Sequence, residues 1–518
     1  MLVRSGVMRI TFLGHVGMFV ETRFGSVLCD PWFTPAYFGS WFPFPRNDLI
    51  DVERFETPDY LYISHLHRDH FDPEWLASHV DKSARVLLPD FRVPYLERSL
   101  RDLGFEHFVA CRHAQQLDLD GLEVVILAQN APADGPLGDS AIVIGDGETR
   151  VLNQNDARPG SAAELLGFGP YHAQFVQFSG AIWYPVAYSF TEEEKVKLAR
   201  NKRANQMDRA RQYVEWVGAP NVFPCAGPPA FLDSDLYSLN DFDGDDANIF
   251  PDQLVFLGEL ADHGIDSGRL LVPGSVAELH ADQCEITHPD ATNATEPFTD
   301  KRHYLERYAR DWAPWLEAER ASWSTRRRDL VAELRDWFEP LLARAPITSS
   351  GIGGLVVLDV GEGSVAIDFV SGDVREWNGE PAVYRVELDR RLVEACIERN
   401  EADWVNSLFL SARFVAHRDG PFNEYVMTFF KSLSIDRIDF VEQCYREVRG
   451  DRDEWFERDG WRIERFCPHR QADLVEFAEI EGATLTCALH HWEFDLETGE
   501  CRTSPDRVLR CRRIEEQQ

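Results

Sequence analysis

A short apolar run that ends in a histidine-rich turn decides the first part of the fold: residues 60–72 read YLYISHLHRDHFD. The run is typical of a buried β-strand, and the turn after it has the pattern H-x-H-x-D-H. Side chains two residues apart share one face of an extended backbone, so His65 and His67 point the same way. Asp69 and His70 follow around the turn. Four metal-ligand side chains within six residues predict a site for one or two ions.

This strand and turn resemble the metal site of the metallo-β-lactamase fold, an αββα sandwich. Residues 11–15 (TFLGH) and 29–31 (CDP) also fit that fold. The resemblance implies that Asp156 takes the place of the carboxylate that bridges two metals. Hydrolases of this fold carry two further histidines, but the comparable stretches 125–130 (VILAQN) and 222–227 (VFPCAG) contain none. A dinuclear zinc hydrolase would therefore lack two of its ligands.

The ligands that remain favour iron. Two histidines and one carboxylate with open positions are the arrangement of non-heme Fe(II) oxygenases. The sequence leaves two sets of three ligands open, His65 and His67 with Asp156 or Asp69 and His70 with Asp156, and it also allows a two-iron site. The candidate catalytic and metal-binding residues are His65, His67, Asp69, His70 and Asp156.

A second metal motif lies near the C-terminus, where a C-x-H sequence is followed by C-x-x-H. A Rieske [2Fe–2S] centre binds one iron through two thiolates and the other through two imidazoles, which two such loops supply. The flanking sequences 467–474 (CPHRQADL) and 487–501 (CALHHWEFDLETGEC) resemble the Rieske family, except that Arg470-Gln471 stands where the family often has Gly. A structural zinc site does not need the FDLETG hairpin. The predicted cluster ligands are Cys467, His469, Cys487 and His490.

The two sites together predict an oxygenase, because a hydrolase has no use for the electrons of a Rieske cluster. The combination resembles the CMP-N-acetylneuraminate hydroxylase group and its bacterial relatives, some of which oxidise nitrogen in nitroimidazole biosynthesis. The resemblance implies a monooxygenase with a [2Fe–2S] cluster and one or two non-heme irons. It would use O₂ and external electrons on a small polar substrate, by N-oxygenation of an amine such as an aminoazole or by C–H hydroxylation of a nucleotide-sugar-like compound.

Two other functions stay open. A metallo-hydrolase with a redox-regulatory Rieske module would contain zinc and work without a reductant. An electron-transfer protein would use the β-lactamase-like part only as a scaffold. The sialic-acid enzymes place their Rieske domain at the N-terminus, whereas here it is C-terminal, and this order weakens any transfer of their substrate.

Composition excludes several partners. The 518 residues include 88 Asp+Glu and 53 Lys+Arg, a net charge of −35, which argues against nucleic-acid binding and against anionic membranes. No apolar stretch approaches the length of a membrane span, so we expect a cytoplasmic protein. An acidic donor such as a ferredoxin needs a local basic face. The arginines that could form one are Arg462, Arg465, Arg470, Arg502, Arg507, Arg510, Arg512 and Arg513.

We expect an α/β multidomain chain with an all-β Rieske domain at its end. Thr191 and Glu194 predict the start of a helix that continues to about 217, and residues 347–354 (ITSSGIGG) are interpreted as a linker. The sequence does not decide whether the chain forms a homo-oligomer, for which residues 300–434 are the candidate interface. The expected domains are 1–265 (metallo-β-lactamase-like), 266–345 (helical connector), 346–440 (small α+β, sterol-carrier-like) and 445–518 (Rieske).

Overall fold

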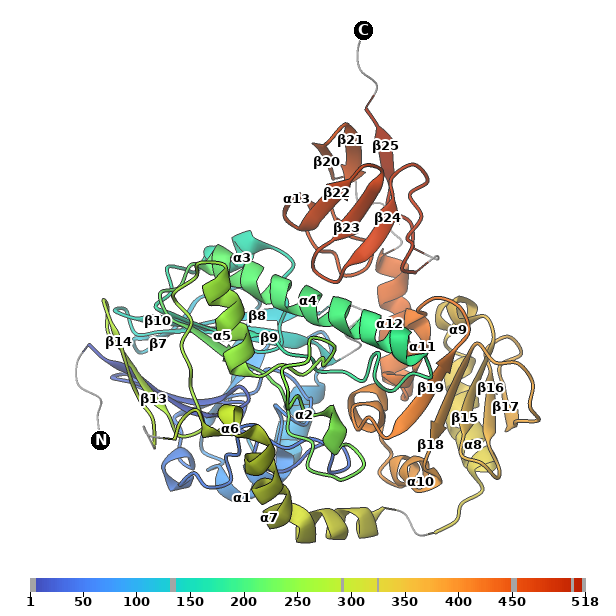
Figure 1. The fold of residues 1–518 in the computed structure, drawn as a ribbon, viewed down its shortest axis with the longest axis horizontal. Coiled ribbons are helices and arrows are strands. Elements are labelled where there is room, and N and C mark those ends of the chain that lie inside the picture. The colour runs from blue at the N-terminus through green and yellow to red at the C-terminus, as the bar shows by residue number, and fades with distance from the viewer. Residues whose placement is uncertain are drawn as a thin grey trace. The chain divides into compact units, whose positions relative to one another are not determined.

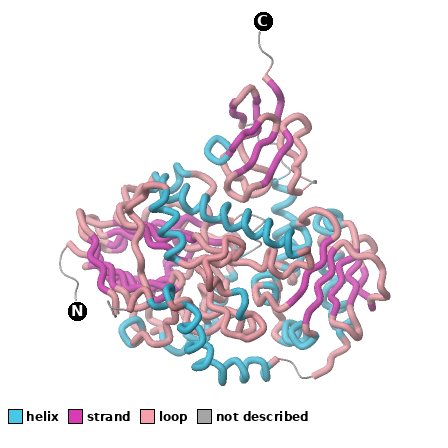
Figure 2. Tube along the Cα trace, viewed as in Figure 1, coloured by secondary structure: helices cyan, strands magenta, loops and turns pink. Residues whose placement is uncertain are grey.

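The computed structural model describes residues 6–130, 137–289, 293–323, 326–448, 454–504 and 507–514. These residues form two compact units (Figure 1). The first unit comprises the described residues of 1–130, 137–182 and 196–320, and the second comprises those of 183–195 and 321–518. Figure 2 shows the strands of each unit gathered into sheets, with helices and loops around them.

Two β-sheets form the centre of the first unit. One has the order β14 (Cys284–Thr287), β13 (Val276–Leu279), β1 (Met8–Gly14), β2 (Gly17–Thr22), β3 (Gly25–Cys29), β4 (Tyr60–Tyr62), β5 (Arg85–Pro89) and β6 (Phe108–Cys111). The other has the order β12 (Val222–Cys225), β11 (Ala173–Gln177), β10 (Arg150–Asn153), β9 (Asp139–Gly145), β8 (Leu122–Gln129) and β7 (Leu117–Leu119).

Apolar side chains on both faces of the first sheet explain why the unit is layered. Ile10 and Val27 join Ile126, Ile142 and Phe175 of the second sheet in one buried core. The opposite face of the first sheet packs against helices α1 (Pro73–His79) and α2 (Tyr95–Asp102) in a second core. Helix α4 (Glu192–Val217) contacts β11, and α5 (Gln253–Asp262) packs on β12. The predicted αββα sandwich of the metallo-β-lactamase fold is thus confirmed.

Helix α4 begins as predicted, with the Thr191 hydroxyl accepting a hydrogen bond from the Glu194 N–H at 3.3 Å. Short helices α3 (Ala162–Leu166) and α6 (Glu296–Thr299) and the longer α7 (Lys301–Ser322) complete the unit. The aromatic side chains Tyr304 and Tyr308 of α7 lie in a core with Phe42 and Phe44. The spacing of Tyr304 and Tyr308 along α7 therefore reflects packing of this helix against the rest of the first unit.

The first domain extends beyond the expected boundary at residue 265. Strand β13 pairs with β1 over four residues, and β14 pairs with β13, so both belong to the first sheet. The expected helical connector over 266–345 therefore begins with two strands. Each strand has only four residues, VAEL and CEIT, which is too short for an alternating pattern to identify it as a strand.

A five-stranded sheet forms the first part of the second unit. Its order is β17 (Asp373–Glu376), β16 (Val365–Asp368), β15 (Leu355–Asp359), β18 (Tyr384–Leu388) and β19 (Phe414–Arg418). The helices of this part are α8 (Leu330–Leu342), α9 (Pro346–Ile352), α10 (Arg390–Glu398), α11 (Glu424–Phe430) and α12 (Ile435–Val448).

The interpretation of residues 347–354 as a linker is wrong, because this segment forms helix α9. The buried Glu442 carboxylate accepts hydrogen bonds from the N–H groups of Ile347 (3.1 Å) and Thr348 (2.8 Å), which have no partner inside the helix. Gly353 ends the helix in a left-handed conformation, with φ of 61°. The cap comes from a residue almost a hundred positions away, so local sequence gave no sign of it.

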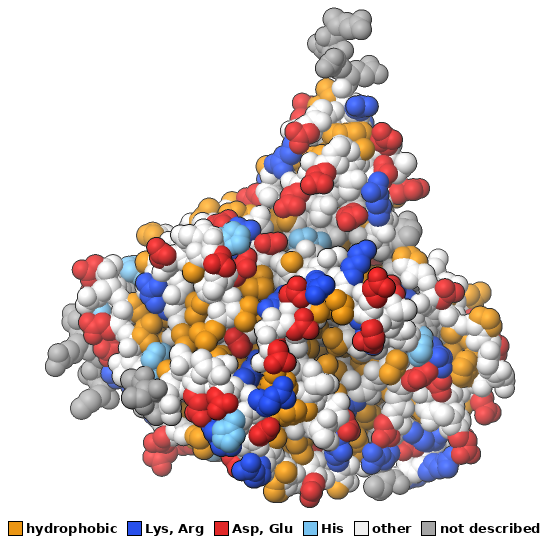
Figure 3. Space-filling model, viewed as in Figure 1, with side chains coloured by type: hydrophobic (Ala, Val, Ile, Leu, Met, Phe, Trp, Pro, Cys, Tyr) orange, Lys and Arg blue, Asp and Glu red, His pale blue; other side chains and the backbone are white. Residues whose placement is uncertain are grey.

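Two small antiparallel sheets form the C-terminal part. One consists of β20 (Trp455–Arg458), β21 (Trp461–Glu464) and β25 (Cys511–Arg513), and the other of β22 (Ala478–Glu481), β23 (Thr484–Cys487) and β24 (Trp492–Asp495), with the single-turn helix α13 (Leu474–Phe477) beside them. Among the described residues, no helix is both long and apolar enough to cross a membrane. Acidic and basic side chains lie interspersed over the face in Figure 3.

Candidate metal centres

The histidine-rich turn lies where several strands of the first unit end. Asp30 directly follows β3, and His65 comes soon after β4, which runs parallel to β3. In the second sheet, Asp156 follows β10, and Gln177 is the last residue of the parallel strand β11. His15 lies in the turn between β1 and β2, with φ of 56°. The carboxyl ends of the parallel strands therefore bring these distant side chains to one edge of the sandwich.

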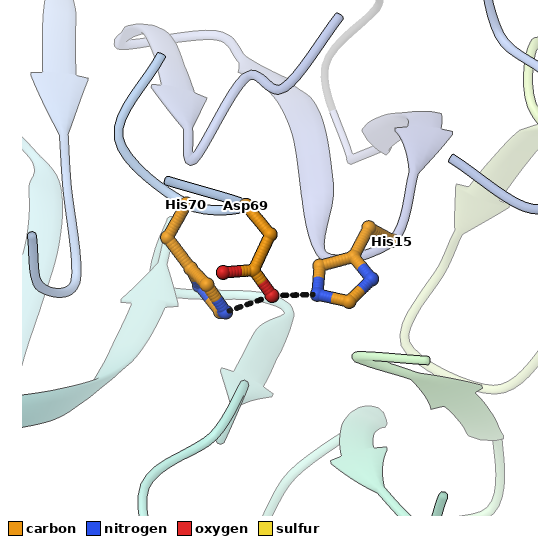
Figure 4. A group of neighbouring side chains, drawn as sticks. All are labelled: His15, Asp69 and His70. Atoms are coloured by element: carbon orange, nitrogen blue, oxygen red, sulfur yellow. Dashed lines mark ion pairs between the residues drawn. The ribbon is translucent and has the colours of Figure 1, made fainter. Parts of the chain in front are cut away.

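Two overlapping groups of ligand atoms form at this edge. Atoms of His65, His70 and Asp156 lie within 4.8 Å of one another, and so do atoms of His15, Asp69 and His70. Figure 4 shows the second group, in which Asp69 Oδ2 is 3.0 Å from His15 Nε2 and 3.8 Å from His70 Nε2. In the first group, His70 Nε2 is 3.6 Å from Asp156 Oδ1. Because His70 belongs to both groups, they form one continuous site.

The other nitrogen of each central imidazole is held by hydrogen bonds. Asp30 Oδ2 lies 3.0 Å from His70 Nδ1, and the same oxygen accepts a hydrogen bond from the Ser64 hydroxyl. The Ser64 hydroxyl is 2.9 Å from His65 Nδ1, and Asp139 Oδ1 is 3.3 Å from that nitrogen. Such contacts fix the orientation of a metal-binding histidine and its tautomer.

The carboxylates are held in the same way. The phenolic group of Tyr37 donates a 2.5 Å hydrogen bond to Asp69 Oδ1. The Gln177 amide donates a 2.7 Å hydrogen bond to Asp156 Oδ1, and its oxygen accepts one from Arg158 at 3.0 Å. The hydrogen bonds from Tyr37 and Gln177 hold the two carboxylates beside the histidines.

Buried nitrogen atoms without hydrogen-bond partners show that these residues fit a metal ion. The Nε2 atoms of His65 and His70 are buried, and neither has a hydrogen-bond partner in the described parts of the chain. A buried polar atom without a partner costs free energy, and coordination of a cation removes that cost. Two free imidazole nitrogens beside the Asp156 carboxylate form a suitable donor set for a first-row transition metal.

The electrostatics of the site also favour a cation. Burial lowers the pKa of His65, and His70 adds to this effect, so the His65 imidazole stays neutral as a metal ligand must be. Burial opposes ionisation of Asp69, but the imidazoles of His70 and His15 hold its pKa well below its usual range. The pKa of Asp156 is lowered despite burial, again through His70. Burial alone would lower the pKa of His70, but Asp156 and Asp69 raise it well above its ordinary value, so a protonated His70 supplies the positive charge that these buried carboxylates require. A divalent ion bound at His70 would take the place of that proton.

Four of the five predicted metal-site residues fall in these groups: His65, Asp69, His70 and Asp156. The fifth, His67, belongs to neither group, although its ring centroid is 4.2 Å from that of His65. His15 was not among the predicted ligands. The TFLGH segment had only indicated the fold, because nothing in the sequence shows that the β1–β2 turn reaches the residue-70 turn.

The C-terminal loops bring the four predicted cluster ligands together. The thiols of Cys467 and Cys487 are buried and close enough for a hydrogen bond between them, whereas His469 and His490 are half-buried. The two imidazole ring centroids are 4.9 Å apart, and His469 stacks on Trp492 at 3.8 Å. Two inner thiols and two outer imidazoles form the donor set of a Rieske cluster.

Both cluster loops contain a residue other than Gly in the left-handed region. Gln471 has φ of 59°, and the loop is closed by its N–H, which donates a hydrogen bond to the Cys467 carbonyl at 2.9 Å. In the second loop His491 has φ of 56°, and its N–H donates to the Cys487 carbonyl at 2.7 Å. The departure at Gln471 therefore leaves the loop geometry intact.

The expected basic face around the cluster is smaller than its arginine count indicates. Arg507 is buried against Glu424 of α11 and over the ring of Tyr425, and Arg470 turns inward, with Nη1 2.9 Å from His490 Nε2. These two arginines therefore do not contribute to a docking surface. Arg502, Arg512 and Arg513 are exposed.

Comparison with protein families and curated proteins agrees with this architecture. Residues 330–447 match a family described as an Rv3818-like, SCP2-like domain, and residues 455–511 match the Rieske [2Fe-2S] domain. The chain is 45% identical over 516 residues to the Mycobacterium tuberculosis protein named "Putative Rieske 2Fe-2S iron-sulfur protein Rv3818", covering 98% of this chain and 100% of that protein. A relative in Mycolicibacterium smegmatis is 45% identical over 520 residues, with the same coverage.

More distant similarities concern smaller parts of the chain. Cytidine monophosphate-N-acetylneuraminic acid hydroxylase of Danio rerio is 26% identical over 240 residues, 43% of this chain and 39% of that enzyme. Similar solved structures include CmlA, a diiron β-hydroxylase from Streptomyces venezuelae (21% identity, 53% of this chain, 54% of that chain, TM-score 0.35). Another is an isothiocyanate hydrolase from Delia radicum gut bacteria (14% identity, 53% of this chain, 100% of that chain, TM-score 0.37).

The domain match confirms the prediction of a Rieske [2Fe–2S] cluster and of a sterol-carrier-like middle domain. The identity of 45% over almost the whole chain establishes the family. The chain belongs to the Rv3818-like family of Rieske 2Fe–2S proteins, with a metallo-β-lactamase-fold domain, an SCP2-like domain and a C-terminal Rieske domain.

Proposed function

We propose that the protein is an oxygenase, in which a non-heme iron site in the first unit acts on a small polar substrate with electrons from the Rieske cluster. The distant similarity to CMP-N-acetylneuraminic acid hydroxylase supports a hydroxylation. N-oxygenation of an amine is the alternative reaction within this proposal. The proposal also includes a cytoplasmic location, an external electron donor and a small-molecule substrate.

One observation carries the proposal: the buried Nε2 atoms of His65 and His70 lie beside the Asp156 carboxylate in one group of ligand atoms. This is the two-histidine, one-carboxylate arrangement that leaves positions open on iron. His15 and Asp69 lie against the same His70 and can hold a second ion. Two histidines expected for a zinc hydrolase are missing near 125–130 and 222–227.

When bound, the iron site supplies O₂ activation, and the cluster supplies single electrons. The reaction balances as one substrate C–H or N–H bond, one O₂, two electrons and two protons giving one C–OH or N–OH group and one water. The residues of this chain orient the site. Asp30 and Ser64 set the tautomers of His70 and His65, and Gln177 holds Asp156 in place.

The proposed electron donor is an acidic one-electron carrier such as a ferredoxin. Docking on the exposed Arg502, Arg512 and Arg513 of the Rieske domain would be electrostatic, and the rate of cluster reduction would then fall as salt screens the charges. Charge reversal at Arg512 and Arg513 should slow reduction by the donor, whereas the same change at Lys197 in the first unit should leave the rate unchanged. Reduction that does not depend on salt would contradict this docking site.

Metal analysis combined with O₂ uptake tests the oxygenase. We expect three or four irons per chain, two of them in the cluster, and O₂ consumption that requires a reductant and rises with substrate. A His70→Ala variant should lose the additional iron and keep the two cluster irons. Stoichiometric zinc, only two irons and turnover without a reductant would instead identify a metallo-hydrolase with a redox-regulatory Rieske module. A His70→Ala variant with unchanged function would indicate an electron-transfer protein.

A further inference from the structure

Three cationic side chains lie together beside the proposed iron site. Arg158 is two residues beyond the candidate ligand Asp156 and is linked to it through Gln177. Lys202 and Arg209 belong to helix α4. The charges of Arg158 and Arg209 act on Lys202, and that of Arg158 acts on Arg209, so the three side chains are electrostatic neighbours.

Helix α4 places its cations over the loops that leave β10 and β11. Positions 202, 206, 209 and 213 share one face of a helix. At one end of this face, the Tyr213 hydroxyl donates a 2.8 Å hydrogen bond to the Pro159 carbonyl, in the loop after Asp156. In the middle, the Gln206 amide reaches the Ser179 carbonyl at 3.5 Å, just beyond Gln177. The face therefore covers the two loops that hold Asp156 in position.

Two of these cations, Arg158 and Lys202, lack among the described residues the carboxylate partners that buried charges normally have. Within the described residues, neither Arg158 nor Lys202 forms an ion pair with an acidic group, although the chain has 88 Asp and Glu residues against 53 Lys and Arg. The buried Arg158 Nε, Ser179 Oγ and Gln206 Oε1 atoms also have no hydrogen-bond partner there. Partly buried cations and unused polar atoms at one place are costly unless a ligand satisfies them.

The lowered pKa of Lys202 reflects this free-energy cost. Burial, followed by repulsion from Arg158 and Arg209, lowers the pKa of Lys202 to about 7. Burial and the charge of Arg158 lower the pKa of Arg209 to about 9. An anion between the three side chains would reverse the repulsion and would form charge-assisted hydrogen bonds to Arg158 and Lys202.

We propose that Arg158, Lys202 and Arg209 bind a carboxylate or phosphoryl group of the substrate and so place its reacting atom at the iron site. The identification of the anion with the substrate rests on the proposed oxygenase function, whereas the existence of the anion site does not. A neutral amine or sugar would leave Arg158 and Lys202 without an acidic partner, so the substrate class narrows to small organic anions. Arg158 also couples the bound anion to Asp156 through Gln177.

Sulfate and acetate are the probes, because each is a small anion of constant charge above pH 6. Calorimetric titration of the full-length protein should show saturable sulfate binding, with acetate binding if the site prefers carboxylates. Lys202→Met should weaken binding at least tenfold, whereas Lys202→Arg, which keeps the charge, should retain it. Lys197→Met is the matched control, since Lys197 is exposed on the same helix and should not affect binding.

The outcomes separate this site from the iron site. Sulfate binding that is unchanged in Lys202→Met, or that disappears in Lys202→Met and Lys197→Met alike, would overturn the anion site. Binding that is lost when the additional metal is chelated but kept in Lys202→Met would show that sulfate binds the metal, and would also overturn it. If the protein contains zinc and consumes no O₂, the proposed oxygenase function is wrong. Sulfate binding that depends on Lys202 would still support the anion site.

Discussion

Asp30 Oδ2 lies 3.0 Å from His70 Nδ1, and both side chains are fully buried. The contact fixes which nitrogen of His70 carries the proton, and so leaves Nε2 available for a metal. Asp30 also accepts a hydrogen bond from the Ser64 N–H at 2.7 Å. One carboxylate therefore joins β3, the histidine-rich turn and the proposed iron ligand.

An Asp30→Asn variant should lose the additional iron while it keeps its fold. Asp30 has φ of 38°, a left-handed conformation that Asn tolerates. The new amide would donate to His70 Nδ1 and move the proton to Nε2, which then cannot bind a metal. Loss of such a contact costs about 10–100-fold in metal affinity. Iron analysis checks this. The control is Asp59→Asn, because Asp59 comes just before β4, at the end of that strand away from the site. Equal iron content in the two variants would contradict the role of Asp30.

The cluster ligands can be tested separately from the first unit. His469→Ala should abolish the EPR signal of a reduced Rieske centre, whereas His491→Asn should retain it, because Asn also tolerates the left-handed backbone at that position. Trp492→Leu should keep the signal but release iron faster on heating, since the stacked indole covers His469. An unchanged signal in His469→Ala would reject the assignment of this histidine.

The buried pair Glu424–Arg507 should stabilise the second unit. Arg507 Nε donates to Glu424 Oε1 at 3.0 Å, and the pair joins the SCP2-like and Rieske domains. Removal of one partner from a buried pair costs about 3–5 kcal/mol, because the other charge stays buried. Glu424→Leu alone should be strongly destabilising in urea unfolding, and a Glu424→Leu/Arg507→Met double variant should recover most of the loss. Additive losses in the double variant would count against a coupled pair.

Lys202 should give the unfolding free energy a distinct pH dependence. Its pKa is about 7 in the folded protein and about 10.4 in an unfolded chain. Between these values the unfolded chain binds more protons, so the contribution of Lys202 to stability rises with pH. The stability advantage of Lys202→Met over the parent protein should be largest below about pH 7 and should shrink toward pH 10. Urea unfolding of both proteins across this range checks the prediction, and a constant difference would refute it.

The sequence predicted those site residues that lie close together in the chain. The H-x-H-x-D-H turn follows a strand directly, so local geometry was enough to place His65 and Asp69 near His70, which belongs to both ligand groups. The Rieske loops were equally clear, because each carries a Cys and a His within four residues and a recognisable hairpin. In both cases short-range spacing determines which side chains can meet.

Contributions from distant segments were not predictable. His15 and Asp30 reach the site because β1 to β4 are neighbours in one sheet, and no spacing rule connects them with residue 70. Lys202 lies on a helix whose start and end were predicted, but not the face that packs inward. Only the packing of α4 over the loop at Pro159 shows that this face is turned toward the site.

The hairpin of β13 and β14 determines how the first unit can be produced by itself. A recombinant fragment that ends at residue 265 would lack both strands, and β1 would become an open edge of the sheet. Exposed backbone N–H and C=O groups along such an edge pair readily with other molecules. We therefore expect this fragment to aggregate, whereas a fragment that ends near residue 320 keeps the edge covered and retains the packing of α7 against Phe42 and Phe44.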